Sequence, residues 1–207
     1  MNVPQATKSG FPDGLRWAAL VWLAIWVAVY WRAWGAWNFL HLCDIAVILT
    51  LIGLWSNSRL LISSQAVSSL LADAAWALDA GWRYFLGRHL LGGTEYLFDP
   101  RHPLWLRLLS LYHLLIPPLL LWALHRTGYD RRGWGLQSAI ALPVLIASRF
   151  ASPRDNINFA FTDPFFHRAW APAPAYLAVI FLLTVFAAYL PTHLVLKRLF
   201  SLPMRDA

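Results

Sequence analysis

Cys43, the only cysteine in the chain, lies in a short run of groups that can take part in acid–base or nucleophilic chemistry. The run reads His41-Leu42-Cys43-Asp44, close to the start of an apolar segment. On a helix His41 and Asp44 share a face because they are three residues apart, whereas Cys43 points about 160° away from His41. If Cys43 is a nucleophile, we therefore expect its general base to come from another helix.

A stripe of polar residues on a later apolar segment offers such a base. Arg107, Ser110, His113 and Pro117 follow one another at spacings of 3, 3 and 4 residues, which places them on one face of a helix. The imidazole of His113 is the natural general base in this stripe. The structural alternative is a buried histidine that only bonds a neighbouring carboxylate.

These residue types predict a site for acyl transfer or hydrolysis. Cys43 would attack an ester carbonyl and His113 would accept the thiol proton, with Asp44 and Asp73 as further catalytic residues. The polar groups that could bind substrate or stabilise an oxyanion are His41, Arg107, Arg149, Asn156 and Asn158. The structural alternatives are a packing role for the cysteine, turn caps for the asparagines, and arginine salt bridges for Asp73 and Asp79.

The composition indicates that lipid surrounds the elements that carry these residues. Hydrophobic residues make up 59% of the 207-residue chain and charged residues only 13%, whereas soluble domains are about 45–50% apolar and about 25% charged. Since a membrane-spanning helix needs about 20 apolar residues, we predict an all-α bundle of about six transmembrane helices. The apolar segments are 15–34, 38–56, 59–84, 103–125, 134–150 and 174–198.

The segment 59–84 differs from the others because it is amphipathic. Gln65, Ser69, Asp73 and Asp79 lie mostly on one helical face, together with Trp76. A helix of this kind fits the interior of a bundle, with its polar side directed inward. The alternative is a helix in the plane of the membrane interface, but the segment is long enough to cross the bilayer.

The connections between the apolar segments predict the topology of a single domain covering 1–207. A polar tail, 1–14, precedes the first segment, and the short basic link 126–133 favours the cytoplasmic side. Both termini would then be cytoplasmic, and the loops 85–102 and 151–173 would lie on the other side. In this arrangement Cys43, Asp44, Asp73 and His113 all belong to the non-cytoplasmic half of the membrane.

The segment Asn38-Phe39-Leu40-His41-Leu42-Cys43-Asp44 resembles the signature of the YwaF-like integral membrane proteins, which are mostly bacterial. A later histidine, His113, and the stretch Asn156-Ile157-Asn158-Phe159 also resemble features of that family. The resemblance covers roughly 38–160 and implies six spans. A vertebrate relative of the family is a phospholipid acyltransferase with a membrane cysteine, so the resemblance implies that Cys43 is the acyl acceptor and His113 its base.

Other functions fit the sequence less well. Most basic residues lie singly at the ends of apolar segments, where they meet lipid phosphates; this placement argues against nucleic acid as a partner. The expected partners are membrane lipids and other membrane proteins, in a multi-pass protein of the bacterial inner membrane. A non-enzymatic scaffold or lipid-binding subunit is the main alternative. A haem protein, with His41/His113 and His125/His193 as axial pairs, and a transporter are further alternatives; we expect no metal or cofactor.

Overall fold

The computed structural model describes residues 10–200, and no strand occurs between these residues. The all-α prediction is thus confirmed, and each of the predicted apolar segments corresponds to a helix. In chain order the elements are α1 (Asp13–Trp34), η1 (Ala36–Leu40), α2 (Leu42–Trp55), α3 (Arg59–Leu86), α4 (Glu95–Phe98), α5 (Leu104–Leu108), η2 (Leu109–Leu111), α6 (Tyr112–Thr127), α7 (Gly133–Ser148), η3 (Ile157–Phe159), α8 (Ala173–Leu183), the π-helical η4 (Thr184–Tyr189) and α9 (Leu190–Phe200).

Four of the described helices are long and apolar enough to cross a membrane. They are Asp13–Trp34, Arg59–Leu86, Leu104–Thr127 and Ala173–Phe200. The first, third and last agree with the predicted spans, and the second is the amphipathic segment. The other two predicted spans are shorter apolar helices, with 14 residues in α2 and 16 in α7, whereas a full crossing takes about 20.

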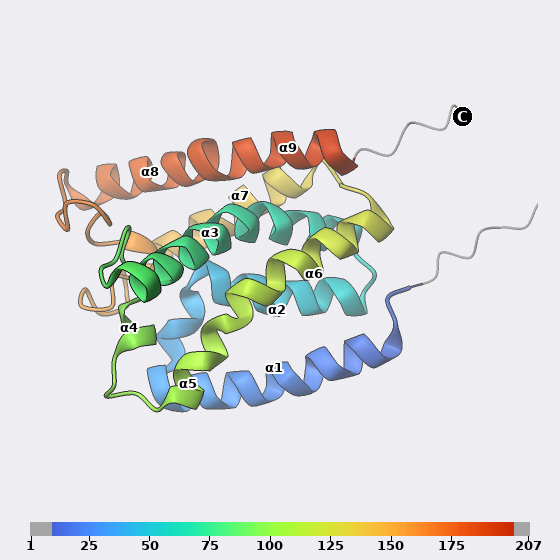
Figure 1. Cartoon of the computed structure of the whole chain (residues 1–207). Helices are drawn as coiled ribbons and strands as arrows, with labels where there is room; N and C mark the ends of the chain where they lie inside the picture. Colours follow the sequence, from blue (N-terminus) through green and yellow to red (C-terminus); the bar gives the residue numbers. More distant parts are fainter. Residues whose placement is uncertain (1–9, 201–207) are drawn as a thin grey trace, which may run out of the picture.

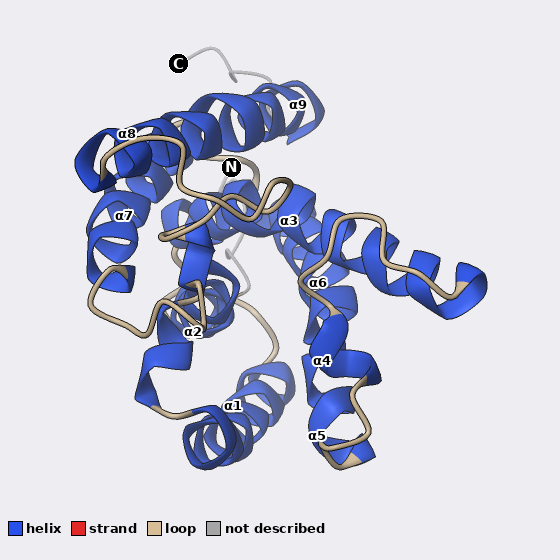
Figure 2. Cartoon of the chain, turned by 90° about the vertical axis from the view of Figure 1, so that its left-hand side faces the viewer, coloured by secondary structure: helices blue, strands red, loops and turns tan. Residues whose placement is uncertain are grey.

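The amphipathic helix α3 occupies the centre of the bundle. It packs against α2, α6 and α7, while α1 and the continuous helix formed by α8, η4 and α9 lie on opposite outer sides (Figures 1 and 2). This central position explains the amphipathic pattern, because the polar face of α3 is buried between its neighbours. Its buried polar residues are Ser63, Ser64, Gln65, Ser68, Ser69, Asp73 and Asp79.

A close approach between two helices joins the start of α3 to the start of α7. A Cβ atom added to Gly133 would lie 2.8 Å from Cβ of Ser63 and 2.9 Å from its carbonyl carbon, so no larger residue fits there without displacing α3. The backbone N–H of Asp130 donates to the Ser63 hydroxyl at 2.8 Å. One turn further on, the Gln137 amide donates to Ser68 at 2.9 Å. Polar contacts therefore hold these two helices together in an apolar surrounding.

The helix ends fall into two groups at the two ends of the bundle. The start of α1, the end of α2, the start of α3 and the end of α9 lie at one end, on the right of Figure 1. The end of α3, the start of α2, and the short helices α4 and α5 lie at the other. The predicted polar tail 1–14 is described only from Gly10 onward, and its first nine residues lie outside the described structure.

Candidate functional site

Asp73 and His113 form a buried pair between the middle of α3 and the start of α6. Nδ1 of the imidazole lies 2.7 Å from Oδ1 of the carboxylate, and the side chains are only 7% and 2% exposed, respectively. A carboxylate in this position fixes the orientation of the ring. The sequence predicted both residues as site residues from different helices, and the fold brings them into direct contact.

Aromatic rings hold the imidazole of His113 in place. Its ring stacks on Trp76 with centroids 4.6 Å apart and on Tyr112 with centroids 4.2 Å apart. Trp76 is itself fixed, because its indole N–H donates to the Tyr96 hydroxyl at 3.1 Å. Among the described residues Nε2 of His113 has no hydrogen-bond partner, yet it is not sealed from its surroundings as a fully buried polar atom would be. An imidazole nitrogen without a hydrogen-bond partner is the atom through which a histidine can exchange a proton.

Asp44 is the centre of a second cluster, directly beside the first. Its carboxylate accepts hydrogen bonds from the Tyr112 hydroxyl at 2.6 Å and from the Asn38 amide at 2.7 Å, and only 2% of the residue is exposed. Tyr112 and His113 are adjacent in α6, so the same turn of this helix supplies a hydrogen-bond partner to Asp44 and another to Asp73. The two clusters thus form one polar centre contributed by η1, α2, α3 and α6.

Cys43 lies at the edge of this polar centre and is half-buried with a free thiol. Its Sγ is 4.0 Å from Oδ1 of Asp44, and it is close enough to Asp73 for an electrostatic interaction. Within residues 10–200 no hydrogen bond joins Cys43 to a histidine. In this conformation the S–H group is directed toward the carboxylate of Asp44 and not toward His113.

His41 lies just outside α2 and faces the same centre. Its imidazole is near enough to His113 for the two charges to interact. Three tyrosines that sequence reasoning did not select also lie there, since Tyr30 and Tyr96 interact electrostatically with Asp44 and Cys43 and Tyr112 bonds Asp44 directly. The adjacency of Tyr112 to His113 was a signal that could have identified one of them.

Asn158 connects the polar centre to α7, although it was predicted to bind substrate. Its side chain accepts the backbone N–H of Leu42 at 3.0 Å, donates to the carbonyl of Leu40 at 2.7 Å and donates to the Ser148 hydroxyl at 3.0 Å. These bonds hold the backbone on both sides of His41. Asn158 has the left-handed backbone angle φ of 52°, which asparagine tolerates better than most residues.

The other three predicted binding residues contact loop backbone. The guanidinium of Arg107 donates to the carbonyl of Leu97 at 3.0 Å, and that of Arg149 donates to Ala160 at 3.0 Å while lying 4.2 Å from the Phe161 ring centroid. Asn156 closes its own loop through Thr162, with its amide donating to the carbonyl at 2.9 Å. The fold therefore gathers His41, Cys43, Asp44, Asp73 and His113, whereas Arg107 in α5, Arg149 at the end of α7 and Asn156 in the following loop bond backbone carbonyls around this centre.

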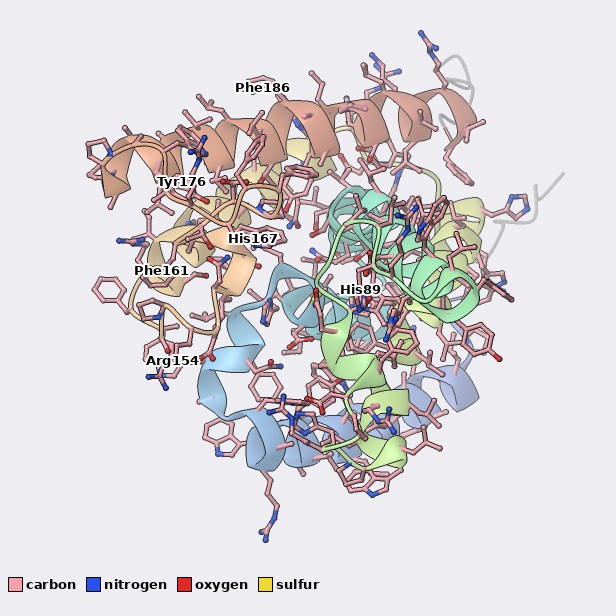
Figure 3. The ribbon with its side chains drawn as sticks, turned by 60° about the vertical axis from the view of Figure 1, so that its left-hand side comes forward. His89, Arg154, Phe161, His167, Tyr176 and Phe186 are labelled. Atoms are coloured by element: carbon pink, nitrogen blue, oxygen red, sulfur yellow. The ribbon has the colours of Figure 1, made fainter. Side chains whose placement is uncertain are left out.

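Asp79 anchors the loop that follows α3. Oδ1 accepts the backbone N–H groups of Leu90, Leu91 and Gly92 at 2.8, 2.6 and 3.0 Å, and Oδ2 contacts the Thr94 hydroxyl and Nδ1 of His89. His89 lies beside the end of α3 (Figure 3). The arginine salt bridges considered for Asp73 and Asp79 are wrong, since Asp73 pairs with His113 and Asp79 with this loop.

The loop between α7 and α8 is held by its own polar groups. The Asp163 carboxylate accepts the backbone N–H groups of Phe165 and Phe166 at 2.9 and 2.6 Å. These bonds favour the charged form and hold the pKa of the Asp163 carboxyl below its usual value of 3.8. The hydroxyl of Tyr176, at the start of α8, donates to the carbonyl of Phe159 at 2.9 Å. Phe161 and Tyr176 lie on the same side of the bundle (Figure 3).

Among the described residues, no three His, Cys, Asp or Glu side chains converge in a way that could hold a metal ion. The second histidine pair considered for haem does not form a matched site, because Nδ1 of His193 contacts the Tyr129 hydroxyl at 2.7 Å and His125 is exposed on the last turn of α6.

Comparisons with protein-family models, curated proteins and solved structures found no match. The functional argument therefore depends on the geometry of the polar centre.

Proposed function

We propose that the chain is a membrane-embedded enzyme that transfers or hydrolyses the acyl group of a lipid ester. The observation that carries this proposal is the buried Asp73–His113 pair, with Nδ1 held at 2.7 Å and Nε2 left available. A histidine oriented by a carboxylate is the general-base half of a nucleophilic site. Its location, between two helices long enough to cross a membrane, favours a substrate dissolved in lipid.

In the proposed reaction Cys43 is the nucleophile. The reaction requires the Cys43 side chain to rotate away from Asp44, so that its S–H reaches Nε2 of His113, which accepts the proton. The thiolate then forms a bond to the ester carbonyl carbon, the carbon–oxygen bond breaks, and the departing alcohol takes the proton from His113. Water or a second alcohol cleaves the thioester in the same way. Asp73 stabilises the imidazolium formed in each half of the reaction.

The proposal includes six spans and a bacterial inner-membrane location. The helix α2 would cross with the help of η1, which precedes it, and α7 would cross in contact with α3. The start of α1 and the end of α9 lie at the same end of the bundle (Figure 1), which supports termini on one side, proposed to be the cytoplasm. The resemblance of the His-x-Cys segment to YwaF-like proteins supports the same arrangement.

Thiol reactivity in native membranes tests the proposal. Cys43 would be labelled with a long-chain electrophile and followed by mass spectrometry in the wild type, in His113→Gln and in His125→Gln. The control, His125, is on the same helix but exposed. Labelling that is about tenfold faster than for a free thiol and falls only in His113→Gln supports an activated cysteine. Slow labelling that is equal in all three proteins would eliminate Cys43 as the nucleophile.

A scaffold function is the second candidate, and the end of α3 is the observation that favours it. Tyr84, Phe85 and Leu86 are 74%, 80% and 57% exposed at the point where α3 extends beyond its neighbours (Figure 2). Exposed aromatic residues of this kind are typical of contacts between proteins. The test is affinity purification from mild detergent. A stable partner that is lost in Phe85→Ser and retained in Cys43→Ser would favour the scaffold over the enzyme.

A further inference from the structure

The loop between α7 and α8, residues 149–172, carries exposed aromatic side chains at the end of a helix of membrane-spanning length. Phe165 and Phe166 are 70% and 72% exposed, and Trp170 is 45% exposed. The loop leads directly into Ala173–Phe200, which is long and apolar enough to cross a membrane, and it lies beyond the start of that helix (Figure 1). The ends of membrane-spanning helices lie in the interfacial region of the bilayer, in which interfacial segments bury Trp and Phe side chains.

A closed turn holds the two phenylalanines at the surface. The Asp163 carboxylate accepts the backbone N–H groups of Phe165 and Phe166 at 2.9 and 2.6 Å. Two further bonds close the backbone of the turn, from the N–H of His167 to the carbonyl of Asp163 at 3.2 Å and from the N–H of Asp163 to the carbonyl of Arg168 at 3.3 Å. The turn therefore satisfies its own backbone N–H groups and leaves two rings exposed, and exposed apolar patches of this kind mark interaction sites, including those with membranes.

Exposed arginines belong to the same loop. The guanidinium carbon of Arg168 lies 5.7 Å from the centroid of the Phe166 ring, and Arg154 lies exposed at the edge of the molecule (Figure 3). Among the described residues neither guanidinium forms an ion pair or a hydrogen bond. Both arginines therefore keep their donor groups for a partner outside the described chain.

These features fit the headgroup region of a lipid bilayer. A guanidinium beside an inserted ring can bind the phosphate that lies just above the acyl chains, because anionic lipids attract arginine at the membrane surface. The loop has three arginines and two aspartates, and neither aspartate neutralises Arg168. Asp163 bonds backbone N–H groups, and Asp155 is close enough to His41 for an electrostatic interaction. The charge of the turn therefore complements an anionic phospholipid.

We propose that the turn 163–168 anchors the protein in the bilayer, with Phe165 and Phe166 at the level of the lipid esters and Arg168 on the phosphate of an anionic phospholipid. The turn thus binds the lipid surface through two apolar rings and one cation. The proposal depends on Ala173–Phe200 crossing the membrane and not on acyl transfer, since the proposed catalytic residues take no part in the turn.

The anchor has a consequence for the polar centre. Asn158, in the same loop, accepts the backbone N–H of Leu42 at 3.0 Å and donates to the carbonyl of Leu40 at 2.7 Å, on the two sides of His41. The loop that holds the turn in the membrane is therefore bonded directly to the backbone of the polar centre. The depth of the anchor sets the depth of this centre below the lipid headgroups.

A fluorescent dye at position 165 measures the depth of the turn. The intact chain with Phe165→Cys and Cys43→Ser would carry the dye NBD on its single thiol, in vesicles of phosphatidylglycerol and phosphatidylcholine. A nitroxide on the acyl chain close to the ester should quench the dye severalfold more than iodide in the aqueous phase. Iodide quenching as strong as for the free dye would overturn the proposal, since it would place the turn in water. Protection from both quenchers would also overturn it, since it would place another protein chain over the turn.

Matched serine variants of this labelled protein test the insertion of the rings. Phe166→Ser removes the second ring of the turn and should raise the iodide quenching severalfold. Phe85→Ser is the control, because Phe85 is similarly exposed, at 80%, but lies at the end of α3; it should leave the quenching unchanged. Equal iodide quenching in the two variants would show that Phe166 does not hold the turn in the membrane.

Spin-labelled headgroups test the role of the arginine. Nitroxide-labelled phosphatidylglycerol should quench the dye more strongly than labelled phosphatidylcholine present at the same trace level. This preference should fall about fivefold in Arg168→Gln, which corresponds to about 1 kcal/mol for one arginine near the lipid surface. Arg101→Gln is the control, because Arg101 is exposed but pairs with Asp99. An equal preference in Arg168→Gln and in the parent protein would show that Arg168 does not bind the phosphate.

Discussion

Two aspartates of α3, Asp73 and Asp79, each contact a histidine from another part of the chain. The two carboxylates differ in their other hydrogen-bond partners. Asp79 contacts His89 at 2.9 Å and also accepts three backbone N–H groups and the Thr94 hydroxyl. Asp73 contacts His113 at 2.7 Å, and among the described residues its carboxylate has no second partner. The first carboxylate is saturated with hydrogen bonds, whereas the second has acceptor capacity left over.

Under the proposed function, this difference separates a structural role for Asp79 from a chemical role for Asp73. A buried carboxylate that accepts several backbone N–H groups fixes a loop, and any change in its charge would break several bonds at once. A buried carboxylate with one histidine partner can follow a change of charge on that histidine. The two carboxylates are about equally buried, but they differ in the number of hydrogen-bond partners, and the His89 side chain is more exposed than that of His113, at 24% against 7%.

The largest expected effect on stability comes from removing the Asp79 carboxylate. Asp79→Ala removes the acceptor of every bond in the loop anchor, and we expect a loss of about 3–5 kcal/mol in the free energy of unfolding. Thermal unfolding in detergent, followed by circular dichroism, would measure it. Asp99→Asn is the control, since the Asp99–Arg101 pair is at the surface and its loss should leave the transition unchanged. A stable Asp79→Ala protein would mean that the loop is held by other contacts.

The second prediction concerns the coupling between Asp73 and His113. Asp73→Asn and His113→Gln should each destabilise the protein, and the double variant should be less destabilised than the sum of the two. We expect a coupling free energy of about 1–3 kcal/mol. If the two effects simply add, the contact at 2.7 Å contributes no net stability. Unfolding by denaturant or heat, measured in one detergent for the wild type, the two single variants and the double variant, would give this coupling free energy.

The third prediction tests whether Asn158 acts through its hydrogen bonds or through its backbone angle. Asn158→Ala loses three side-chain bonds and also places alanine at a φ of 52°, whereas Asn158→Gly loses only the bonds. We expect the alanine variant to be the less stable one by about 1 kcal/mol. The same thermal unfolding assay measures the difference. Equal stability would indicate that the backbone angle relaxes when the side chain is removed.

The smallest expected effect is a local change with pH in the loop after α7. The pKa of Asp163 is lowered in the folded protein, so the stabilising contribution of its carboxylate is complete above the unfolded value of 3.8 and is lost as the pH falls through the lower folded value. Hydrogen exchange at Phe165 and Phe166 should therefore stay slow down to about pH 4 and accelerate below it. In Asp163→Asn the exchange should no longer depend on this titration.

The length of the apolar segments was sufficient to predict the helices but not their contacts. Each apolar segment became a helix because a chain in lipid must satisfy its backbone hydrogen bonds internally. The meeting of Asp73 and His113 could be expected only as a shared depth in the membrane, since the sequence does not state which faces of two helices meet. The Asp79 anchor was missed for a related reason. Its partners are mostly backbone N–H groups, which have no signature in the side-chain sequence beyond the glycines at 92 and 93.

The contact between Gly133 and Ser63 has a mechanical consequence. With 2.8 Å between an added Cβ and the serine side chain, any side chain at position 133 would push the start of α3 away from α7. The bond from Gln137 to Ser68 one turn further on would be strained by the same displacement, so a glycine at this one position sets the spacing of two helices.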